Sequence, residues 1–152
     1  MMPIFIDLND KKVVIFGGGE LGGWKAKKFL EGGCKKILIA SKNFSEEIKS
    51  LGEDVKIIQR DLTKGFEDLL EGAFIVIPAT NDEKLNNLII EKSMKRGILT
   101  NHKKGDLFLS SVVRDGKIQI AISTGGESPA VSKYLRIKLE EFLKMELHKM
   151  KG

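Results

Sequence analysis

Five short apolar runs, rich in β-branched residues, punctuate the first hundred residues of the chain. Most positions within each run are apolar, a pattern typical of strands in a parallel sheet covered on both faces. The runs predict strands at residues 12–16, 37–40, 55–58, 73–77 and 98–100. Segments of helical spacing separate them, so the order favours an α/β fold with a doubly wound parallel sheet.

Capping signals set the expected ends of the intervening helices. Glycine is common just after a helix, and Ser, Asn or Asp just before one. The sequence predicts a helix over 20–31 ended by Gly32, one over 45–51 capped by Ser45, and a short helix or turn over 65–70. A further helix starts after Asn81 or Asp82 and ends at Gly97.

The pattern changes near residue 105, the only internal boundary that the sequence indicates. Residues 107–113 and 117–123 flank an Asp115-Gly116 pair, which predicts a β-hairpin. Ser128-Pro129 then starts a helix of roughly 33 Å, longer than so small a core needs. We expect two parts, 1–105 and 106–152, with the helix covering a partner subunit through an apolar stripe of Val131, Leu135, Leu139, Phe142, Leu143, Leu147 and Met150.

Composition and charge narrow the function by exclusion. The 152 residues carry a net charge of +5, and 41% of them are hydrophobic. No apolar run reaches the ~18 residues of a membrane span, and the N-terminus lacks a secretory signal, so we expect a cytoplasmic protein without membrane contact. The single Cys34 excludes an intrachain disulfide and a thiolate zinc site, and no metal ligand set stands out. Scattered lysines without interleaved aromatics favour an acidic small molecule over nucleic acid as partner.

A glycine motif follows the first predicted strand and starts the first predicted helix. Gly17, Gly19 and Gly22 have the G-x-G-x-x-G spacing of a Rossmann-type dinucleotide site. The first glycine permits a tight turn, the second a close approach of the pyrophosphate, and the third close packing of helix and strand. The motif predicts NAD binding, although a glycine-rich turn without a ligand would have the same pattern.

The second strand lacks the acidic residue that usually holds the ribose of NAD. It ends in Ser41-Lys42 instead. Ser41 can hydrogen-bond a ribose, and Lys42 can either neutralise the 2′-phosphate of NADP or simply face solvent. NADP therefore stays open as the cofactor.

Other polar residues follow the later strands at the same edge. Thr80 can face the cofactor or cap its own loop, and His102 can act as an acid or base or be a plain surface residue. Near the C-terminal helix, Gly125-Gly126 before Ser128 offers free amides that suit a carboxylate or phosphate. A plain capped helix start would explain Ser128 but leave the two glycines without a role.

Together these segments resemble the precorrin-2 dehydrogenase family, the dehydrogenase and ferrochelatase module of siroheme synthases. The residues that carry the resemblance are Pro3-Ile4-Phe5, Gly17-Gly-Gly-Glu-Leu21, Lys25, Ala79-Thr80, Leu85-Asn86, Asn101 and Ala121-Ile-Ser-Thr-Gly-Gly-Glu-Ser-Pro-Ala130. The resemblance implies NAD-dependent oxidation of precorrin-2 to sirohydrochlorin by a homodimer. It further implies that Glu20, Leu21, Ser41 and Lys42 touch the cofactor, and that Asn101, Gly125, Gly126 and Ser128 belong to the site of the acidic tetrapyrrole.

The sequence departs from the family in the loop after Asn101. The family has an aspartate three residues later, credited with acid–base work in dehydrogenation and iron insertion, where this chain has Lys104. Asp106 or His102 could take over that work, or Asp106 could match another family aspartate just before the hairpin. The chain also stops where relatives continue into a helical domain. Both departures count against the chelatase activity.

Two alternatives share parts of the pattern. A nucleotide-sensing regulatory domain, of the kind that gates potassium transport, would have the same length and glycine motif. It should also have an acidic residue after the second strand, and Lys42 argues against that. The other alternative is a relative that binds a tetrapyrrole without catalysis.

Overall fold

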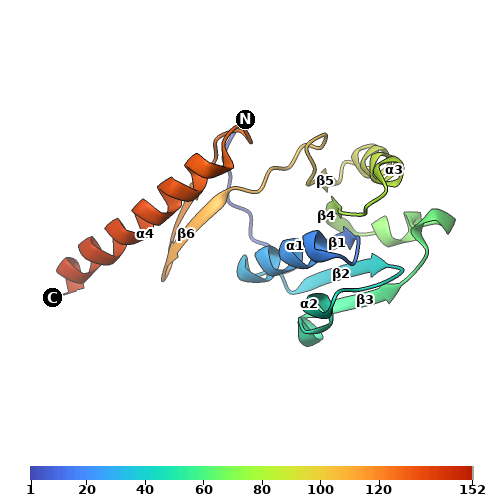
Figure 1. Cartoon of the computed structure of the whole chain (residues 1–152), viewed down its shortest axis with the longest axis horizontal. Coiled ribbons are helices and arrows are strands. Elements are labelled where there is room, and N and C mark those ends of the chain that lie inside the picture. The colour runs from blue at the N-terminus through green and yellow to red at the C-terminus, as the bar shows by residue number, and fades with distance from the viewer. Residues whose placement is uncertain (152) are drawn as a thin grey trace. The chain divides into compact units, whose positions relative to one another are not determined.

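The computed structural model describes the backbone of residues 1–151 and the side chains of residues 1–146. The chain divides into two compact units. One comprises Ile6–Leu107, and the other combines Met1–Phe5 with the chain from Phe108 onward. Figure 1 labels the elements of both units and colours them in chain order, from blue at the N-terminus to red at the C-terminus.

A five-stranded parallel sheet forms the centre of the larger unit, in the order β3-β2-β1-β4-β5. β1 (Lys12–Phe16) lies between β2 (Lys36–Ser41) and β4 (Ala73–Pro78), while β3 (Val55–Gln59) and β5 (Leu99–Thr100) form the edges. All neighbouring strands are paired in parallel. The predicted parallel α/β sheet is therefore confirmed, with strand ends within two residues of those expected.

Helices α1 (Glu20–Glu31) and α3 (Glu83–Met94) connect the strands as the sequence predicts. Ser45 caps the next helix as expected, because its hydroxyl accepts from the backbone N–H of Ile48. That helix, α2 (Glu46–Lys49), is shorter than predicted and is followed by a 3₁₀ turn, η1 (Gly52–Asp54). The predicted helix or turn over 65–70 forms the 3₁₀ turn η3 (Glu67–Leu70), and a further turn, η2 (Leu62–Lys64), precedes it.

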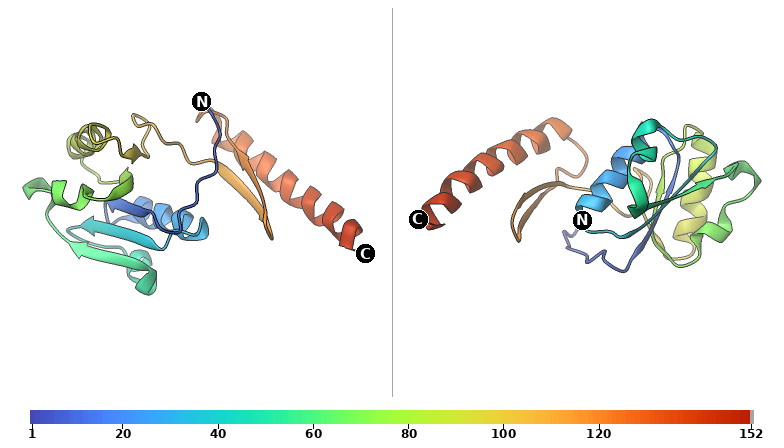
Figure 2. Two further views of the ribbon diagram at one scale, coloured as in Figure 1. Left: turned by 180° about the vertical axis from the view of Figure 1, so that it is seen from behind. Right: turned by 90° about the horizontal axis from the view of Figure 1, so that it is seen from below.

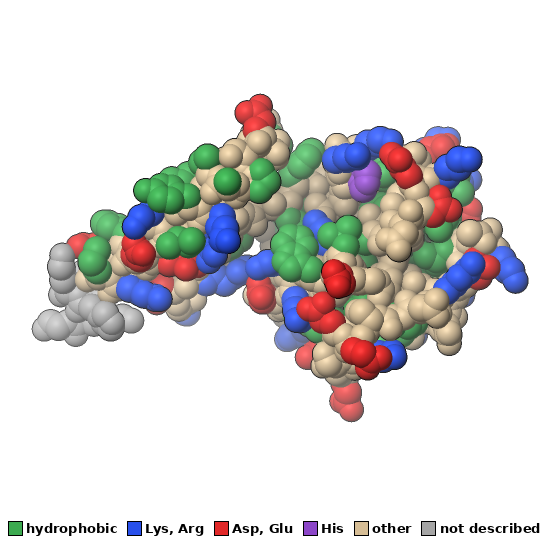
Figure 3. Space-filling view, viewed as in Figure 1, with side chains coloured by type: hydrophobic (Ala, Val, Ile, Leu, Met, Phe, Trp, Pro, Cys, Tyr) green, Lys and Arg blue, Asp and Glu red, His purple; other side chains and the backbone are tan. Residues whose placement is uncertain are grey.

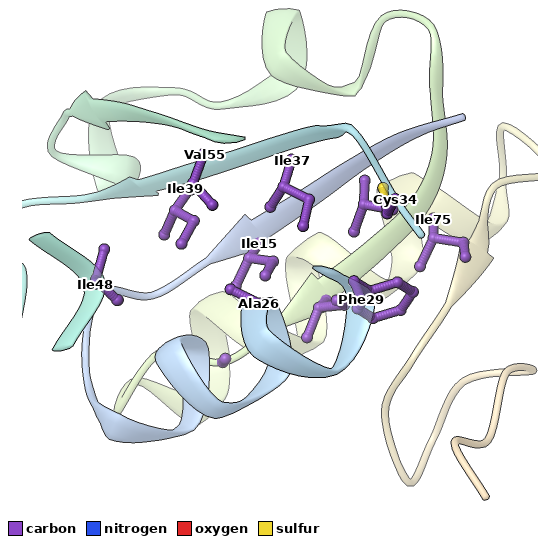
Figure 4. Packing of buried hydrophobic residues seen from close by; sticks show 12 residues of the cluster. Ile15, Ala26, Phe29, Cys34, Ile37, Ile39, Ile48, Val55 and Ile75 are labelled. Carbon is purple, nitrogen blue, oxygen red and sulfur yellow. The ribbon is translucent and has the colours of Figure 1, made fainter. Parts of the chain in front are cut away.

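The core lies in two layers, one on each face of the sheet. Val13 and Ile15 of β1 point to the layer under α1 and α2, which Figure 4 shows from close by. Val14 and Phe16 point to the opposite layer, where the Phe16 and Phe66 rings meet edge to face with centroids 5.4 Å apart. Figure 2 shows α1 and α3 on opposite faces. Strands buried on both faces cannot alternate in polarity, and this explains the continuous apolar runs.

The smaller unit contains an antiparallel hairpin, as predicted, but its strands are displaced. β6 (Ser111–Asp115) pairs with β7 (Ile118–Ile122), so Gly116 and Lys117 form the loop, with Gly116 at φ +58°. The prediction that the first strand starts at residue 107 is wrong. Leu107 donates its N–H to the Thr100 carbonyl over 3.2 Å and forms a parallel bridge with Asn101, which ties it to the end of β5.

The long C-terminal helix is confirmed as α4 (Pro129–Lys151). Ser128 caps it, because its Oγ accepts from the N–H of Val131 over 3.3 Å. α4 packs on the hairpin, where Val113 is 1% exposed. Of the expected apolar stripe, Leu147 and Met150 lie outside the described side chains. Among the described residues, no helix is long and apolar enough to cross a membrane.

Candidate functional site

A cleft of about 450 Å³ lies at the carboxyl ends of β1, β2 and β4. Its walls come from residues 17–20 after β1, 41–45 after β2 and 79–81 after β4. The chain leaves β1 toward β2 on one side of the sheet and later returns to β4 on the other. Such a reversal of strand order is where open α/β sheets bind ligands.

The glycines of the motif make the cleft sterically possible. Gly17 has φ +130°, and a Cβ there would lie 2.2 Å from the Ala79 carbonyl oxygen. A Cβ on Gly22 would lie 2.2 Å from the carbonyl oxygen of Gly17. Gly19 differs, since beyond its chain neighbours no atom of the described residues lies within 4 Å of the position of its Cβ. Two of these glycines thus permit close backbone approach, and the third leaves open space in the cleft wall.

The first turn of α1 supplies hydrogen-bond donors beside this open space. Gly19 is the N-cap residue, and among the described residues it receives no side-chain capping bond. The helical bonds begin with Gly23, which donates to the Gly19 carbonyl over 3.0 Å. The preceding N–H groups and the positive end of the helix dipole suit a phosphate. Glycine backbone, open space and amide donors together fit the pyrophosphate of a dinucleotide.

The Thr80 hydroxyl is engaged in its own loop, one of the two roles that the sequence left open. Its Oγ1 lies 2.7 Å from Asn86 Oδ1, to which it can donate, and it also accepts from the N–H of Asp82. The Asn86 side chain, 9% exposed, accepts from the Thr80 N–H and donates to the Thr80 carbonyl over 2.8 Å. Asn86 is therefore a positioning residue for the cleft wall that reasoning from spacing missed; its signal was an amide on the apolar face of α3.

We expect Asn86→Ala to destabilise the protein by about 2 kcal/mol, because it leaves the partly buried N–H and carbonyl of Thr80 without their partner. The same change should weaken dinucleotide binding by loosening the loop after β4. Chemical denaturation and calorimetric titration measure the two effects. Asn87→Ala is the matched control, since Asn87 is exposed and its Oδ1 accepts from Lys104. An equal loss in both variants would contradict the prediction.

An acidic residue that the sequence analysis did not single out lies beside Lys42. Asp61 follows β3, and its Oδ2 is 3.2 Å from Lys42 Nζ. The hydroxyl of Thr63 and the ammonium of Lys42 hold the pKa of the Asp61 carboxyl below its usual range. Lys42 thus has a carboxylate partner, so neither of its expected roles describes it fully.

Asn101 and Lys25 join α1 to the end of β5. Lys25 Nζ donates to Asn101 Oδ1 over 2.6 Å, and Asn101 Nδ2 donates to the Leu107 carbonyl over 2.8 Å. Asn101 is 7% exposed, and partial burial lowers the pKa of Lys25. Both polar ends of the Asn101 side chain are thereby engaged in holding the loop after β5.

The two acid–base candidates, His102 and Asp106, lie in that loop. Asp106 Oδ1 accepts from the backbone N–H of Thr100 over 2.8 Å. His102 Nδ1 accepts from the N–H of Lys104 over 3.2 Å, and burial together with the nearby Lys103 and Lys104 lowers the pKa of His102. The neutral ring with Nδ1 as acceptor carries its proton on Nε2. Lys104 itself turns toward α3, where it donates to Asn87 and lies 3.6 Å from a Glu83 oxygen.

The glycine pair before α4 has a conformational role in the smaller unit. Gly125 and Gly126 have φ of +67° and +87°, values that favour glycine. Thr124 Oγ1 accepts from the Ser128 N–H and lies 3.2 Å from Ser132 Oγ, so the turn is held from inside. Among the described side chains, no group of three or more His, Cys, Asp or Glu could hold a metal ion.

The fold and the glycine-lined cleft define a dinucleotide-binding protein of the doubly wound α/β class. A family model described as "Putative NAD(P)-binding" matches residues 4–106, and one described as "Sirohaem biosynthesis protein central" matches residues 115–141. Precorrin-2 dehydrogenase from Methanosarcina barkeri is 40% identical over 98% of this chain and 69% of its own length. This chain belongs to the precorrin-2 dehydrogenase family.

Longer relatives and a solved structure agree with that assignment. The siroheme synthase of Buchnera aphidicola is 37% identical over 96% of this chain, which spans 31% of that protein. The structure of "SirC, precorrin-2 dehydrogenase" matches with a TM-score of 0.79 at 26% identity, covering 93% of this chain and 70% of that one. The chain thus spans about a third of the siroheme synthase and most of the dehydrogenases.

Proposed function

We propose that this protein oxidises precorrin-2 to sirohydrochlorin with NAD(P) in siroheme biosynthesis. The observation that carries the proposal is the glycine-lined cleft at the reversal of strand order, in a chain that the dehydrogenase relatives match almost from end to end. The bound nicotinamide would supply the hydride acceptor. The chain's own residues bind the nucleotide, orient the substrate and remove the proton that accompanies the hydride.

Most cofactor residues of the proposal line the cleft, and Leu21 and Gly22 follow its wall in the first turn of α1. Gly17 and Gly19 leave room for the phosphates, and Gly22 lets α1 pack closely on the turn after β1. The first-turn amides of Glu20 and Leu21 donate to the phosphates. Ser41 and Lys42 contact the cofactor at its ribose end. Thr80 contacts it through backbone atoms, because the Thr80 hydroxyl is engaged with Asn86.

The substrate residues of the proposal suit a molecule with many carboxylates. Gly125, Gly126 and Ser128 form a glycine turn at the start of α4, where the positive end of the helix dipole favours an anion. Asn101 with its bonded Lys25 brings a cation to the end of β5. The net charge of +5 attracts an acidic tetrapyrrole more generally.

For proton removal we favour Asp106 over His102. Asp106 holds Thr100 with Oδ1 and keeps Oδ2 as an acceptor. The lone pair on His102 Nδ1 already accepts from the N–H of Lys104, so the ring offers a substrate carboxylate only its Nε2–H donor. The Lys104 side chain turns to α3 and takes no part. Iron insertion is not included in the proposal.

We further propose that residues 1–105 form the nucleotide-binding domain, and that residues 106–152 pair with a second copy to form a homodimer in the cytoplasm.

The length of α4 supports pairing with a second copy. The hairpin strands have five residues each, about 17 Å, whereas α4 has 23 residues, about 34 Å. The hairpin therefore cannot cover the whole helix. Figure 3 shows apolar side chains along α4, and Tyr134, Phe142 and Met145 are 61%, 53% and 60% exposed.

We expect Phe142→Glu to weaken the dimer at least about thirtyfold, because it would place a charge in an apolar interface. Sedimentation equilibrium measures the dissociation constant. Lys144→Glu is the matched control, since two residues along a helix turn the side chain about 200° to the opposite face. A monomeric wild type, or equal weakening by both variants, would show that this surface does not pair with a second copy.

The assay of the proposed function incubates the purified protein anaerobically with precorrin-2 and NAD, then with NADP. Sirohydrochlorin absorbance should rise in step with reduced cofactor. Circular dichroism and thermal melting establish that the sample is folded. A folded sample without turnover on either cofactor would refute the proposal; stabilisation by nucleotide alone would then favour a sensor, and by the tetrapyrrole alone a non-catalytic binding protein.

A further inference from the structure

The ribose end of the cleft has an unusual charge arrangement. A site for NAD normally has an acidic residue at the end of the second strand, where this chain has Lys42. The structure brings a carboxylate there from another strand. β2 and β3 are in register up to Ser41 and Gln59, and Arg60 donates its N–H to the Ser41 carbonyl over 2.9 Å. This pairing sets Asp61 beside Lys42, with Oδ2 3.2 Å from Nζ.

Asp61 is held in place before any ligand binds. It is the N-cap residue of η2, and its Oδ1 accepts from the N–H of Thr63 over 3.1 Å and from the Thr63 hydroxyl over 2.6 Å. The Asp61 side chain is 26% exposed, whereas that of Lys42 is 59% exposed. The carboxylate is thus the more firmly held member of the pair, and the lysine is the more exposed one. The low pKa of Asp61 keeps it charged at neutral pH.

The surrounding charges offer little to a second phosphate. Asp61 lines a shallow hollow of about 380 Å³ together with Arg60, Lys64, Gly65 and Asp68. Arg60 Nη1 donates to both oxygens of Asp68, over 2.6 and 2.8 Å. Three cations at this end, Arg60, Lys42 and Lys64, therefore stand against two carboxylates, because Arg60 pairs with Asp68 and Lys42 pairs with Asp61. The surplus of one positive charge does not balance a 2′-phosphate of about −1.5 to −2, which would also lie close to the Asp61 carboxylate.

We propose that Asp61 makes this protein select NAD over NADP by neutralising Lys42 and repelling a 2′-phosphate. The inference rests on the proposed dinucleotide binding and adds the residue that decides between the two cofactors. A phosphate monoester carries a charge of about −1.5 to −2, so one fixed carboxylate a few ångströms away changes its affinity about tenfold in a water-like dielectric. NAD has hydroxyls at the same position and is little affected.

Calorimetric titration of the full chain with NAD and with NADP tests the inference without any turnover. We expect the wild type to bind NAD at least about tenfold more tightly than NADP. Asp61→Asn keeps an oxygen for Thr63 but removes the charge, so NADP affinity should rise about tenfold while NAD affinity stays within about twofold. Adding Lys42→Ala to Asp61→Asn should abolish the gain.

Asp68→Asn is the matched control, because Asp68 lines the same hollow but pairs with Arg60 instead of Lys42. An unchanged NADP to NAD ratio in Asp61→Asn, an equal change in Asp68→Asn, or a wild type that prefers NADP would each overturn the inference. Those outcomes leave the proposed function intact. Failure of folded protein to bind either nucleotide would overturn the proposed function and this inference together.

Discussion

Replacing Gly22 with alanine is expected to lower the melting temperature of the nucleotide-binding part by about 10 °C or more. The new methyl group would lie 2.2 Å from the Gly17 carbonyl oxygen, and Ile15 closes the space behind it at 3.6 Å. The clash is with a backbone atom rather than with the end of a flexible side chain, so α1 and the turn after β1 would have to separate to relieve it. Such overpacking costs about 2–3 kcal/mol. Differential scanning calorimetry measures the shift.

Gly19→Ala separates stability from binding in the same motif. Apart from its chain neighbours, no described atom lies within 4 Å of the Cβ position on Gly19, so this variant should melt within a few degrees of the wild type. Its methyl group would nevertheless occupy the open space in which we place the phosphates, and NAD affinity should fall at least about tenfold. If Gly19→Ala binds NAD normally, or if Gly22→Ala melts like the wild type, the roles assigned to the two glycines are wrong.

Asp106→Asn is expected to lower kcat about 100-fold or more with little change in KM. Asparagine retains an oxygen that accepts from the Thr100 N–H, so the loop after β5 should keep its conformation. What is lost is the proton acceptor at Oδ2. Steady-state kinetics under anaerobic conditions measures both constants, and the melting temperature should stay unchanged.

His102→Gln is the companion variant for that prediction. Glutamine keeps a polar donor but removes the imidazole. Burial and two nearby lysines hold the pKa of that imidazole below its usual range. We expect a higher KM with kcat within about tenfold, as befits a donor to the substrate. The opposite result, with kcat lost in His102→Gln and retained in Asp106→Asn, would transfer the proton acceptor to His102.

Local sequence patterns predicted most of the fold because their causes are local. The continuous apolar runs follow from strands such as β1, whose side chains are buried on both faces. Ser45 and Ser128 were recognisable as caps because each accepts from an N–H three residues later. The hairpin start was misplaced at residue 107 because Leu107 is held by Thr100 and Asn101, and no residue pattern near Leu107 shows that bond.

The sequence by itself determined the parallel sheet, the glycine cleft after its first strand and the family to which the chain is similar. Only the tertiary structure decided which polar groups are already engaged. Asp61 meets Lys42 because β3 pairs with β2, and Lys25 meets Asn101, 76 residues away, because β1 before α1 and the strand β5 end at the same edge of the parallel sheet. The physical reason is distance along the chain. A cap or a turn is determined by neighbours within a few residues, whereas these pairs form only once the strands have assembled into the sheet in their final order.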